Sequence, residues 1–279
     1  MSHSQNSPVA PQPAWRDRLL ALFRRRGWRG FPKLHHWLKP AGARRELLTR
    51  TRYGSQFYLN PSDGIDTHVL LEDFYESEVL EAVRPVLAPG AVLWVVGANF
   101  GLHAVTAKYL YPDATVVAFE PSPAMAARLL EHCELNGVKL DLHAYALSDH
   151  ADALPFYANT SGNPGMSTLH PVVTFNYGQR FIVATLDAAT VIERGLAPAP
   201  TALIVDAEGA EAEVLRGFGR HLSAPTLRAV VFETGNDFLA TREPADLHAL
   251  VTGAGFSSRA LIRNERTAHN LSNFLATRA

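Results

Sequence analysis

Hydrophobic and polar residues are arranged in two kinds of segment along the chain: short apolar runs, and longer stretches with helical periodicity. The clearest example covers residues 91–122, where an apolar run from Ala91 to Val96 is followed by a turn, a helical pattern and a second apolar run. The second run, from Ala114 to Phe119, ends at Glu120. Short apolar runs bounded by turns are typical of buried strands, so this stretch predicts a strand, a turn, a helix and a strand.

The same alternation continues to the C-terminus and predicts a doubly wound, mainly parallel α/β sheet with short connections. Pro121 and Ser122 begin an expected helix whose buried face holds Ala124, Ala127, Leu130, Cys133 and Leu135. Residues 151–185 are rich in Gly, Asn, Thr and aromatics, which favours hairpins or loops over a site. We expect the other helices at 76–86, 210–222 and 244–252, and strands at 53–59, 140–147, 202–205, 227–232, 256–262 and 271–277.

Composition supports one globular catalytic domain with an N-terminal extension. The chain has 279 residues, 47% of them hydrophobic and 19% charged, which is enough to bury a large core. We predict a disordered tail at 1–13, a basic extension at 14–60 and the catalytic domain at 61–279. The single cysteine, Cys133, excludes an internal disulfide and fits a reducing compartment. No secretory signal pattern and no apolar stretch of about 20 residues is visible, so we expect a soluble, cytoplasmic protein.

Charge is distributed unevenly. Residues 15–53 hold twelve Lys or Arg and two acids, so this segment carries about +10 and the remainder about −11. Trp15, Leu19, Leu22 and Phe23 recur in it at helical spacing. One interpretation is an interfacial helix that contacts an anionic membrane, glycolipid or carrier. The other is a solvated helix packed on the domain, or an oligomer contact. Nucleic acid is not expected, because no binding motif accompanies the charge.

The turn after the first core strand is the first candidate site. It reads Gly97-Ala98-Asn99-Phe100-Gly101, and Glu120 follows about 20 residues later at the end of the next strand. Glycines let a ligand approach the backbone, and a carboxylate at this distance suits the two hydroxyls of a ribose. A dinucleotide site requires Gly-x-Gly-x-x-Gly, which is not present here. The spacing therefore favours S-adenosylmethionine over NAD.

A second candidate site lies in residues 202–218, where Asp206, Glu208 and Glu211 surround a strand-to-helix turn at Gly209. Helix capping would explain part of this cluster. Asp206 also ends a core strand, where a carboxylate can hold a cationic cofactor, accept a proton or bind a metal. A metal held by Asp206, Glu208 and Glu233 is an alternative, but no compact metal-ligand spacing is present and we predict none. His103, at the start of the helix after the glycine turn, is an alternative base.

Together these segments resemble the FkbM family of S-adenosylmethionine-dependent methyltransferases, with coverage from about Tyr53 to the C-terminus. The Tyr75-Glu76 pair and the tail Ser272-Asn273-Phe274-Leu275 also resemble family features. The five ordered motifs that carry the resemblance are Val95 to Gly101, Ala118-Phe119-Glu120-Pro121, Ala146-Leu147-Ser148-Asp149, Thr185-Leu186-Asp187, and Asp206-Ala207-Glu208-Gly209-Ala210-Glu211 through Leu215 and Gly217.

The resemblance implies a class I methyltransferase fold and methyl transfer to a hydroxyl of a sugar, glycolipid or secondary metabolite. It implies that Asp206 and Glu208 face the methyl group and the acceptor. For the cofactor it implies contacts to the methionine part from Gly97, Ala98, Asn99 and Gly101, to the ribose from Glu120, and to the adenine from Ser148 and Asp149. The sequence departs from the family pattern at Val95, where an acid near the methionine end is usual.

Methyl transfer to an alcohol requires loss of the hydroxyl proton. We hypothesise that Asp206 accepts this proton, directly or through water, while Glu208 orients the acceptor. The alternatives are a cofactor-binding or interaction protein without catalysis, which the change at Val95 keeps open, and an NAD-dependent oxidoreductase. The acceptor itself is not readable, but one group of residues in the 151–185 region suits a sugar: Phe156, Tyr157, Asn159, Asn163, Met166, Ser167 and Phe175.

Overall fold

The structure is a computed structural model, and it describes residues 46–160, 163–171, 177–235, 244–261 and 271–278. The expected disordered tail, nearly all of the basic 15–53 segment and Phe175 lie outside the described residues.

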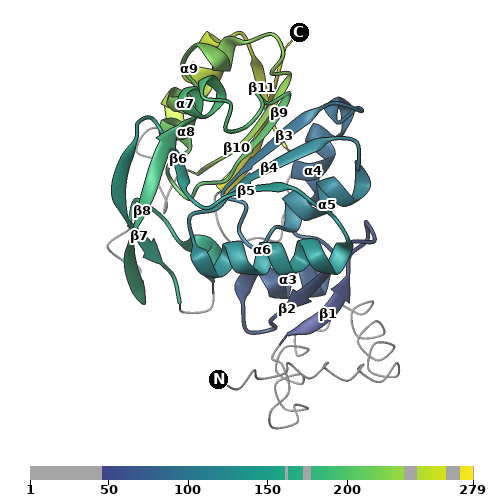
Figure 1. The fold of residues 1–279 in the computed structure, drawn as a ribbon. Coiled ribbons are helices and arrows are strands. Elements are labelled where there is room, and N and C mark those ends of the chain that lie inside the picture. The colour runs from purple at the N-terminus through teal and green to yellow at the C-terminus, as the bar shows by residue number, and fades with distance from the viewer. Residues whose placement is uncertain (1–45, 161–162, 172–176, 236–243, 262–270, 279) are drawn as a thin grey trace.

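A seven-stranded sheet forms the centre of the molecule, and it confirms the predicted α/β class (Figure 1). β3 pairs with both β4 and β9 in parallel, so the chain runs to one side of β3 first and later returns to the other. Such a reversal creates a crevice at the carboxyl ends of the strands. The C-terminal strands β12 and β11 add in antiparallel orientation. The spatial order is β11 (Ser257–Ala260), β12 (Leu271–Thr277), β10 (Ala229–Gly235), β9 (Ala202–Val205), β3 (Val92–Val96), β4 (Thr115–Phe119) and β5 (Asp141–His143).

Helices cover both faces of this sheet because successive strand residues point to opposite sides. In β3, Val95 packs into one hydrophobic core, whereas Trp94 and Val96 pack into the other. The core around Val95 is covered by α3 (Gly64–Glu72), α4 (Ser77–Val83), α5 (Leu102–Leu110) and α6 (Pro123–Asn136), and the other by α7 (Ala188–Glu193), α8 (Glu211–Gly217) and α9 (Pro244–Gly253). The predicted helices 76–86 and 210–222 both end in 3₁₀ turns, Arg84–Val86 and Gly219–Ser223.

A separate three-stranded sheet lies beside the central one. It consists of β6 (Ala146–Ser148), β8 (Gln179–Asp187) and β7 (Asp152–Ala158), in that order. The prediction of one strand over residues 140–147 is therefore wrong, because β5 and β6 belong to different sheets. β5 is an edge strand with one neighbour, so the chain turns away after His143, and Ala146–Ser148 pair with Thr185–Asp187 of β8 instead.

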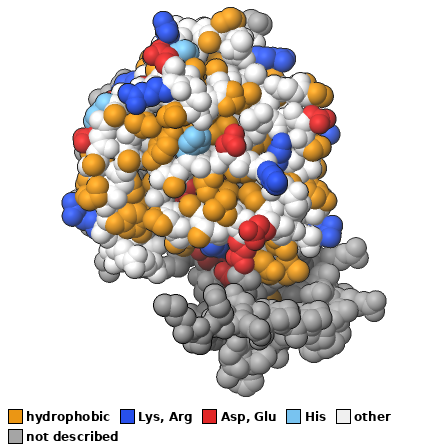
Figure 2. Space-filling view, in the orientation of Figure 1, with side chains coloured by type: hydrophobic (Ala, Val, Ile, Leu, Met, Phe, Trp, Pro, Cys, Tyr) orange, Lys and Arg blue, Asp and Glu red, His pale blue; other side chains and the backbone are white. Residues whose placement is uncertain are grey.

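The buried face of α6 also differs from the prediction. Met125, Ala126, Leu129, His132 and Cys133 are buried, whereas Leu130 is 50% exposed and Ala124 and Ala127 face solvent. Other hydrophobic side chains reach the surface on the face shown in Figure 2, so an exposed leucine is not unusual here.

His132 explains the shift of this face. It is completely buried between α6 and an N-terminal hairpin formed by β1 (Leu47–Arg50) and β2 (Gln56–Leu59). Its Nδ1 lies 2.8 Å from the carbonyl oxygen of Phe100, and its Nε2 accepts the amide proton of Tyr58 at 3.1 Å. Burial lowers the pKa of His132 to about 4, so the ring is neutral at physiological pH. A polar residue in the core thereby anchors the loop that follows Asn99.

Candidate functional site

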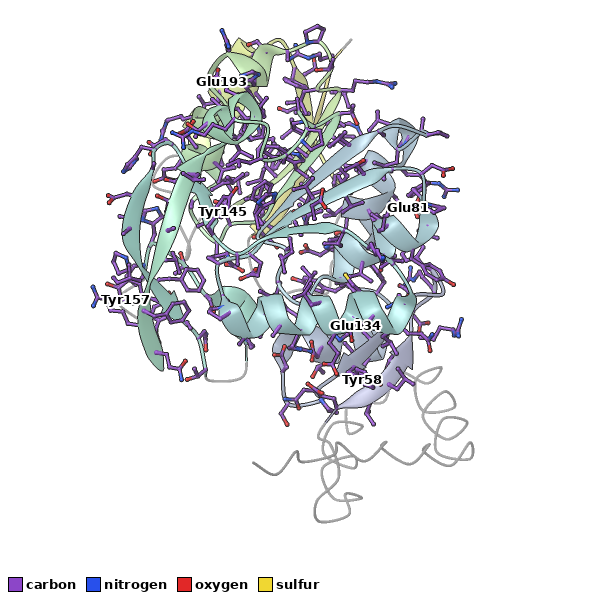
Figure 3. The ribbon with its side chains drawn as sticks, viewed as in Figure 1. Tyr58, Glu81, Glu134, Tyr145, Tyr157 and Glu193 are labelled. Carbon is purple, nitrogen blue, oxygen red and sulfur yellow. The ribbon has the colours of Figure 1, made fainter. Side chains whose placement is uncertain are left out.

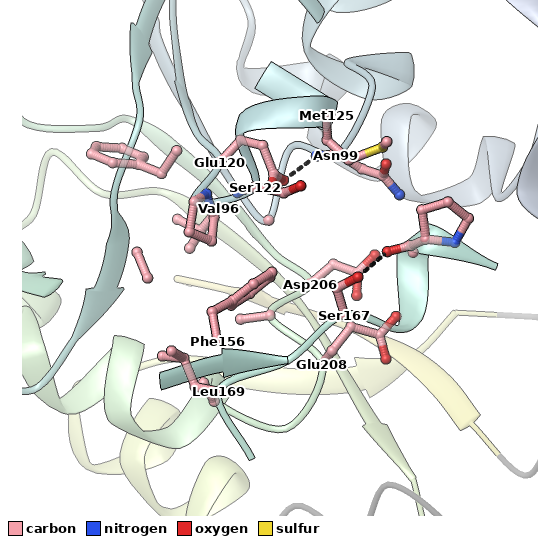
Figure 4. Close-up of a pocket in the computed structure, with 18 of the residues that line it drawn as sticks. Val96, Asn99, Glu120, Ser122, Met125, Phe156, Ser167, Leu169, Asp206 and Glu208 are labelled. Atoms are coloured by element: carbon pink, nitrogen blue, oxygen red, sulfur yellow. Dashed lines mark hydrogen bonds between the residues drawn. The ribbon is translucent and has the colours of Figure 1, made fainter. Parts of the chain in front are cut away.

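A cleft opens where β3, β4 and β9 end, at the reversal in strand order (Figure 4). It encloses about 650 Å³ of empty space, including the part open to solvent. Three segments at the strand ends supply much of the lining: the turn after β3 (Val96, Gly97, Asn99), the end of β4 and start of α6 (Phe119, Glu120, Pro121, Ser122, Met125), and the turn after β9 (Asp206, Ala207, Glu208, Ala210). The other lining residues come from several further elements: Ile65, Ala146, Leu147, Phe156, Pro164, Gly165, Ser167 and Leu169.

Gly97 lets the turns after β3 and β9 come into direct contact. Its φ is +77°, and a Cβ atom at this position would lie 1.7 Å from the carbonyl oxygen of Asp206. No other residue fits this position without moving one of the two turns. Asn99 has a φ of +51°, a value rare for residues other than glycine and common at functional sites.

Glu120 is held rigidly at the end of β4. Its side chain is 5% exposed, and both carboxylate oxygens accept backbone hydrogen bonds of 2.7 Å, one from the amide of Asn99 and one from that of Ser122. Burial nevertheless raises the pKa of Glu120 to about 7. Each carboxylate oxygen can accept more than one hydrogen bond, so Glu120 keeps the capacity to accept from a ligand in the cleft.

The carboxylates after β9 are less satisfied. Oδ1 of Asp206 and Oε2 of Glu208 are buried, and within the described parts of the chain neither has a hydrogen-bond partner. Burial, reinforced by Glu211 and Glu120, raises the pKa of Asp206 to about 7. Burial beside Asp206 also raises the pKa of Glu208 well above its ordinary value. These two side chains therefore form an acidic patch whose hydrogen-bonding capacity is not used by the described fold.

Glu211 has a structural role. It is 2% exposed, and its carboxylate accepts backbone protons from Ala207 at 2.9 Å and from Gly209 at 3.1 Å. These bonds fix the turn that carries Asp206 and Glu208. They do not cap α8, whose N-cap residue Ala210 makes no side-chain hydrogen bond, and Glu211 does not line the cleft.

Five predicted residues lie outside the cleft: Ala98, Gly101, His103, Ser148 and Asp149. His103 lines an adjoining cavity, where its Nε2 is 3.2 Å from the carbonyl oxygen of Glu76, and burial lowers its pKa to about 4. A base this weak is poorly suited to accept a proton at neutral pH. Ser148 and Asp149 do not line the cleft either, and Ala146 and Leu147 of the same segment do. Contact of Ser148 and Asp149 with adenine stays a prediction.

Strand β7 and the loop after it form one wall of the cleft. Phe156, Ser167 and Leu169 line it, and the hydroxyl of Thr168 donates to the carbonyl oxygen of Glu208 at 2.6 Å. Of the proposed sugar-binding residues, Phe156 and Ser167 thus line the cleft. Tyr157 lies on the hairpin at the edge of the molecule in Figure 3 and does not.

Sequence reasoning gave no role in the cleft to Ile65, Met125, Gly165 or Leu169. They are apolar or small residues, and no pattern distinguishes them from residues of the core. It also noted Glu76 only as a family feature. The adjoining cavity contains Glu76 together with Val95 and Asn273.

Within the described ranges, no group of three or more His, Cys, Asp or Glu side chains is arranged to hold a metal ion. Among the helices described there, none combines the length and the hydrophobicity needed to cross a bilayer.

Comparison with known proteins gives a family match and two curated relatives. Residues 96–257 match the model of the methyltransferase FkbM domain. Hexuronic acid methyltransferase AglP of Haloferax volcanii is 29% identical over 184 residues, which is 66% of this chain and 70% of that protein. Methyltransferase 1 of Beauveria bassiana is 27% identical over 180 residues, or 57% of this chain and 70% of that protein. Among solved structures, precorrin 8W decarboxylase of Methanobacterium thermoautotrophicum covers 83% of this chain and 100% of its own, with 13% identity and a TM-score of 0.45.

Proposed function

Because the chain belongs to the FkbM family of methyltransferases, we propose that it methylates a hydroxyl oxygen of a sugar, or of a related glycolipid or secondary metabolite, with Asp206 as the proton acceptor. The enzyme is an S-adenosylmethionine-dependent methyltransferase. The observation that carries the proposal is the carboxylate of Asp206, which lines the cleft with a buried oxygen that the described fold does not use.

The residues around the cleft suit the cofactor. Glu120 would accept hydrogen bonds from the ribose hydroxyls, and the turn at Gly97 and Asn99 would contact the methionine part. The apolar side chains of Leu147 and Phe156 give a surface suited to a purine. When bound, the cofactor supplies an electrophilic methyl group on a positively charged sulfur.

The raised pKa of Asp206 suits this residue to the role of the base. A base works best when its pKa lies near the working pH, and burial brings the pKa of Asp206 to about 7. Burial and the neighbouring Asp206 also raise the pKa of Glu208 well above its ordinary value. Asp206 would then take the proton of the acceptor hydroxyl, while Glu208 holds the acceptor by hydrogen bonds.

The charge of the cleft favours a neutral acceptor group. Among the residues described as lining it, the charged side chains are Glu120, Asp206 and Glu208, with no Lys or Arg. An ionised carboxylate would be repelled by these acids, whereas a hydroxyl would not. The name of the relative from H. volcanii supports a sugar as the acceptor. The family match favours this transferase reaction over a protein without catalysis and over an NAD-dependent oxidoreductase.

A methyl-transfer assay with labelled S-adenosylmethionine tests the proposal. Neutral hexoses, their glycosides and the matching hexuronic acids serve as acceptors, and the neutral compounds should react faster. In Asp206→Asn, kcat should fall about 10²–10⁴-fold, because general-base catalysis contributes this much. Its affinity for S-adenosylhomocysteine, measured by calorimetry, should change little.

Asp152→Asn is the control, since Asp152 is 51% exposed and lies on β7 outside the cleft. It should retain the kcat of the wild type. Full turnover by a folded Asp206→Asn protein would exclude Asp206 as the base. Faster methylation of the hexuronic acids would exclude the preference for a neutral acceptor.

A further inference from the structure

Two segments that line the cleft, the start of α3 and the 3₁₀ turn Pro164–Met166, touch at one apolar contact. A Cβ atom added to Gly165 would lie 2.2 Å from Cδ1 of Ile65. It would also lie 3.2 Å from Nδ2 of Asn99, so the contact is beside the turn after β3. Both Ile65 and Gly165 line the cleft. The space available at this point is therefore set by the Ile65 side chain and by the absence of a side chain at Gly165.

Ile65 is held in this position by its neighbours on α3. The carboxylate of Asp63 caps the helix and accepts the amide proton of Ile65 at 3.1 Å. Asp66, the next residue, has a fully buried side chain that forms an ion pair of 2.7 Å with Arg128 of α6. Such a pair resists displacement, because separating its partners leaves a charge unpaired in the core. Ile65 thus lines the cleft from a fixed helix end.

The turn that carries Gly165 is fixed to the side of the cleft where the acceptor would bind. The hydroxyl of Ser167 donates to a carbonyl oxygen of this turn at 2.7 Å. Thr168 exchanges two backbone hydrogen bonds with Tyr157 of β7, and its hydroxyl donates to the carbonyl oxygen of Glu208 at 2.6 Å. Ser167 and Glu208 lie in the same part of the pocket in Figure 4. A change in this turn therefore acts next to the acceptor.

An apolar contact at this place acts on size and not on charge. Ile65 has no polar group, so it excludes part of an acceptor only by occupying space. In a well-packed pocket, one methylene group changes kcat/KM about 10–200-fold. Ile65 precedes residues 96–257, the part of the chain that matches the family model, whereas Gly165 lies within that part. The contact thus joins the matched domain to a segment outside it.

We propose that Ile65 and Gly165 determine which acceptors the cleft admits, by excluding a substituent larger than a hydroxyl from the ring position that faces this contact. The inference rests on the proposed methylation of a sugar hydroxyl beside Asp206, and it adds a limit on size. The acceptor is then a sugar that carries a free hydroxyl or a hydrogen at this position, and a sugar that is branched or further substituted there is rejected.

Steady-state methyl transfer with a series of acceptors tests this assignment. The series consists of the hexoside that the wild type methylates best and its derivatives, each with an ethyl group on one other hydroxyl. The kcat/KM of the wild type for at least one derivative should be at least tenfold lower than for the parent. In Ile65→Ala this difference should shrink at least fivefold. Ile182→Ala is the control and should keep the difference, since Ile182 is 58% exposed on β8 and lines neither cavity.

Adding volume gives the opposite test. Gly165→Ala pushes Cδ1 of Ile65 into the cleft, so kcat/KM for the parent hexoside should fall at least tenfold. Ile65→Val removes Cδ1, and the double variant Gly165→Ala/Ile65→Val should therefore return to within about threefold of the wild type. Gly253→Ala is the control, because a Cβ atom at this position of α9 meets nothing within 4 Å. The affinity of every variant for S-adenosylhomocysteine, measured by calorimetry, should equal that of the wild type.

The same difference between parent and derivatives in Ile65→Ala and in the wild type overturns the inference. It is also overturned if Ile65→Val does not restore the activity of Gly165→Ala, or if affinity for S-adenosylhomocysteine falls as much as kcat/KM. If Ile65→Ala does not fold, Gly165→Ala and the double variant decide. Equal methylation of all the derivatives by the wild type overturns only this inference. No methylation of any hydroxyl acceptor by the wild type overturns the proposed function and this inference with it.

Discussion

The two carboxylates on opposite sides of the cleft, Glu120 and Asp206, are alike in pKa but differ in their hydrogen bonds (Figure 4). Glu120 accepts from two backbone amides, which fix its orientation before any ligand binds. Asp206 has a buried oxygen with no partner in the described residues. The fold thus supports one carboxylate fully and leaves the other partly unsatisfied.

Under the proposed function, this difference separates a binding half of the site, around Glu120, from a reactive half, around Asp206 and Glu208. A carboxylate fixed by backbone hydrogen bonds is preorganised to receive hydroxyl groups but has little freedom to exchange protons. An unsatisfied carboxylate costs stability, and such a cost is commonly tolerated where function requires it. The comparison can be tested at the contact between the halves, at the two carboxylates and at the loop that covers the reactive half.

The largest effect is expected where the two halves touch. Gly97→Ala places a methyl group 1.7 Å from the carbonyl oxygen of Asp206 at a φ of +77°. The left-handed backbone costs about 1–2 kcal/mol and the overlap about 1–3 kcal/mol, so the free energy of unfolding should fall by about 2–5 kcal/mol. Urea denaturation measures this loss.

Gly90→Ala separates the two contributions. Gly90 has a similar φ of +81°, but a Cβ atom there would meet nothing within 4 Å. Gly90→Ala should lower the free energy of unfolding only by the cost of the left-handed backbone, about 1–2 kcal/mol. Equal losses in the two variants would mean that the turns after β3 and β9 move apart easily.

The next effect is a dependence of stability on pH that distinguishes the two carboxylates. Asp206 has a pKa of about 7 in the folded protein against 3.8 for a free side chain. As pH rises from about 4 to 7, the unfolded chain loses this proton first, so the folded state loses stability. In Asp206→Asn the side-chain amide does not titrate. This variant should therefore be as stable as the wild type near pH 4 and about 1–3 kcal/mol more stable at pH 8.

Glu120→Gln is the matched comparison because the pKa of Glu120 is also about 7. The new side-chain amide can accept from only one of the two backbone amides of Asn99 and Ser122, and it turns an NH₂ group toward the other. This variant should be less stable than the wild type at pH 5, and its deficit should shrink toward pH 8, because Glu120 of the wild type also loses stability as pH rises from about 4.5 to 7. Denaturation without cofactor at both pH values measures these differences. Lower stability of Asp206→Asn than of the wild type at pH 8 would show that Asp206 is a structural carboxylate.

The sequence predicts site residues best where they share one local unit of the chain, and the reason is physical. Gly97, Asn99 and Glu120 lie on one strand–helix–strand unit, where spacing along the chain determines spacing in the fold, and all three line the cleft. Contacts formed by distant segments leave no such pattern. Ile65, Asn273 and the loop with Ser167 are distant along the chain, and the folded structure brings them to the cleft or to the adjoining cavity.

The errors in the predicted strands and helix faces have similar causes. The apolar run over residues 140–147 is continuous, but whether a strand stays in one sheet depends on the partner available at the edge, here β8. In α6 the prediction centred the buried face on Leu130, whereas His132 is buried because Phe100 and Tyr58 satisfy both of its ring nitrogens. A polar residue with such partners cannot be recognised from hydrophobicity alone.

The smallest effect is expected at the loop over the reactive half. The hydroxyl of Thr168 is the donor at 2.6 Å to the carbonyl oxygen of Glu208, whose φ is +51°. Thr168→Val removes this bond and should lower the free energy of unfolding by about 1 kcal/mol. Because Glu208 then loses part of its orientation, KM for the acceptor should rise several-fold, while affinity for S-adenosylhomocysteine is retained.

Thr185→Val distinguishes this role from simple loss of a buried hydroxyl. Thr185 is also 1% exposed, and it donates to the carbonyl oxygen of His150 at 3.0 Å, but it does not line the cleft. It should lose a similar amount of stability and keep the acceptor KM of the wild type. If both variants raise KM equally, the loop affects the acceptor only through overall stability. If only Thr168→Val raises KM, the reactive half depends on the contact from Thr168, which lies outside the β9–α8 unit that carries Asp206 and Glu208. The Glu120 half has no such dependence, because its hydrogen bonds come from the neighbouring turns.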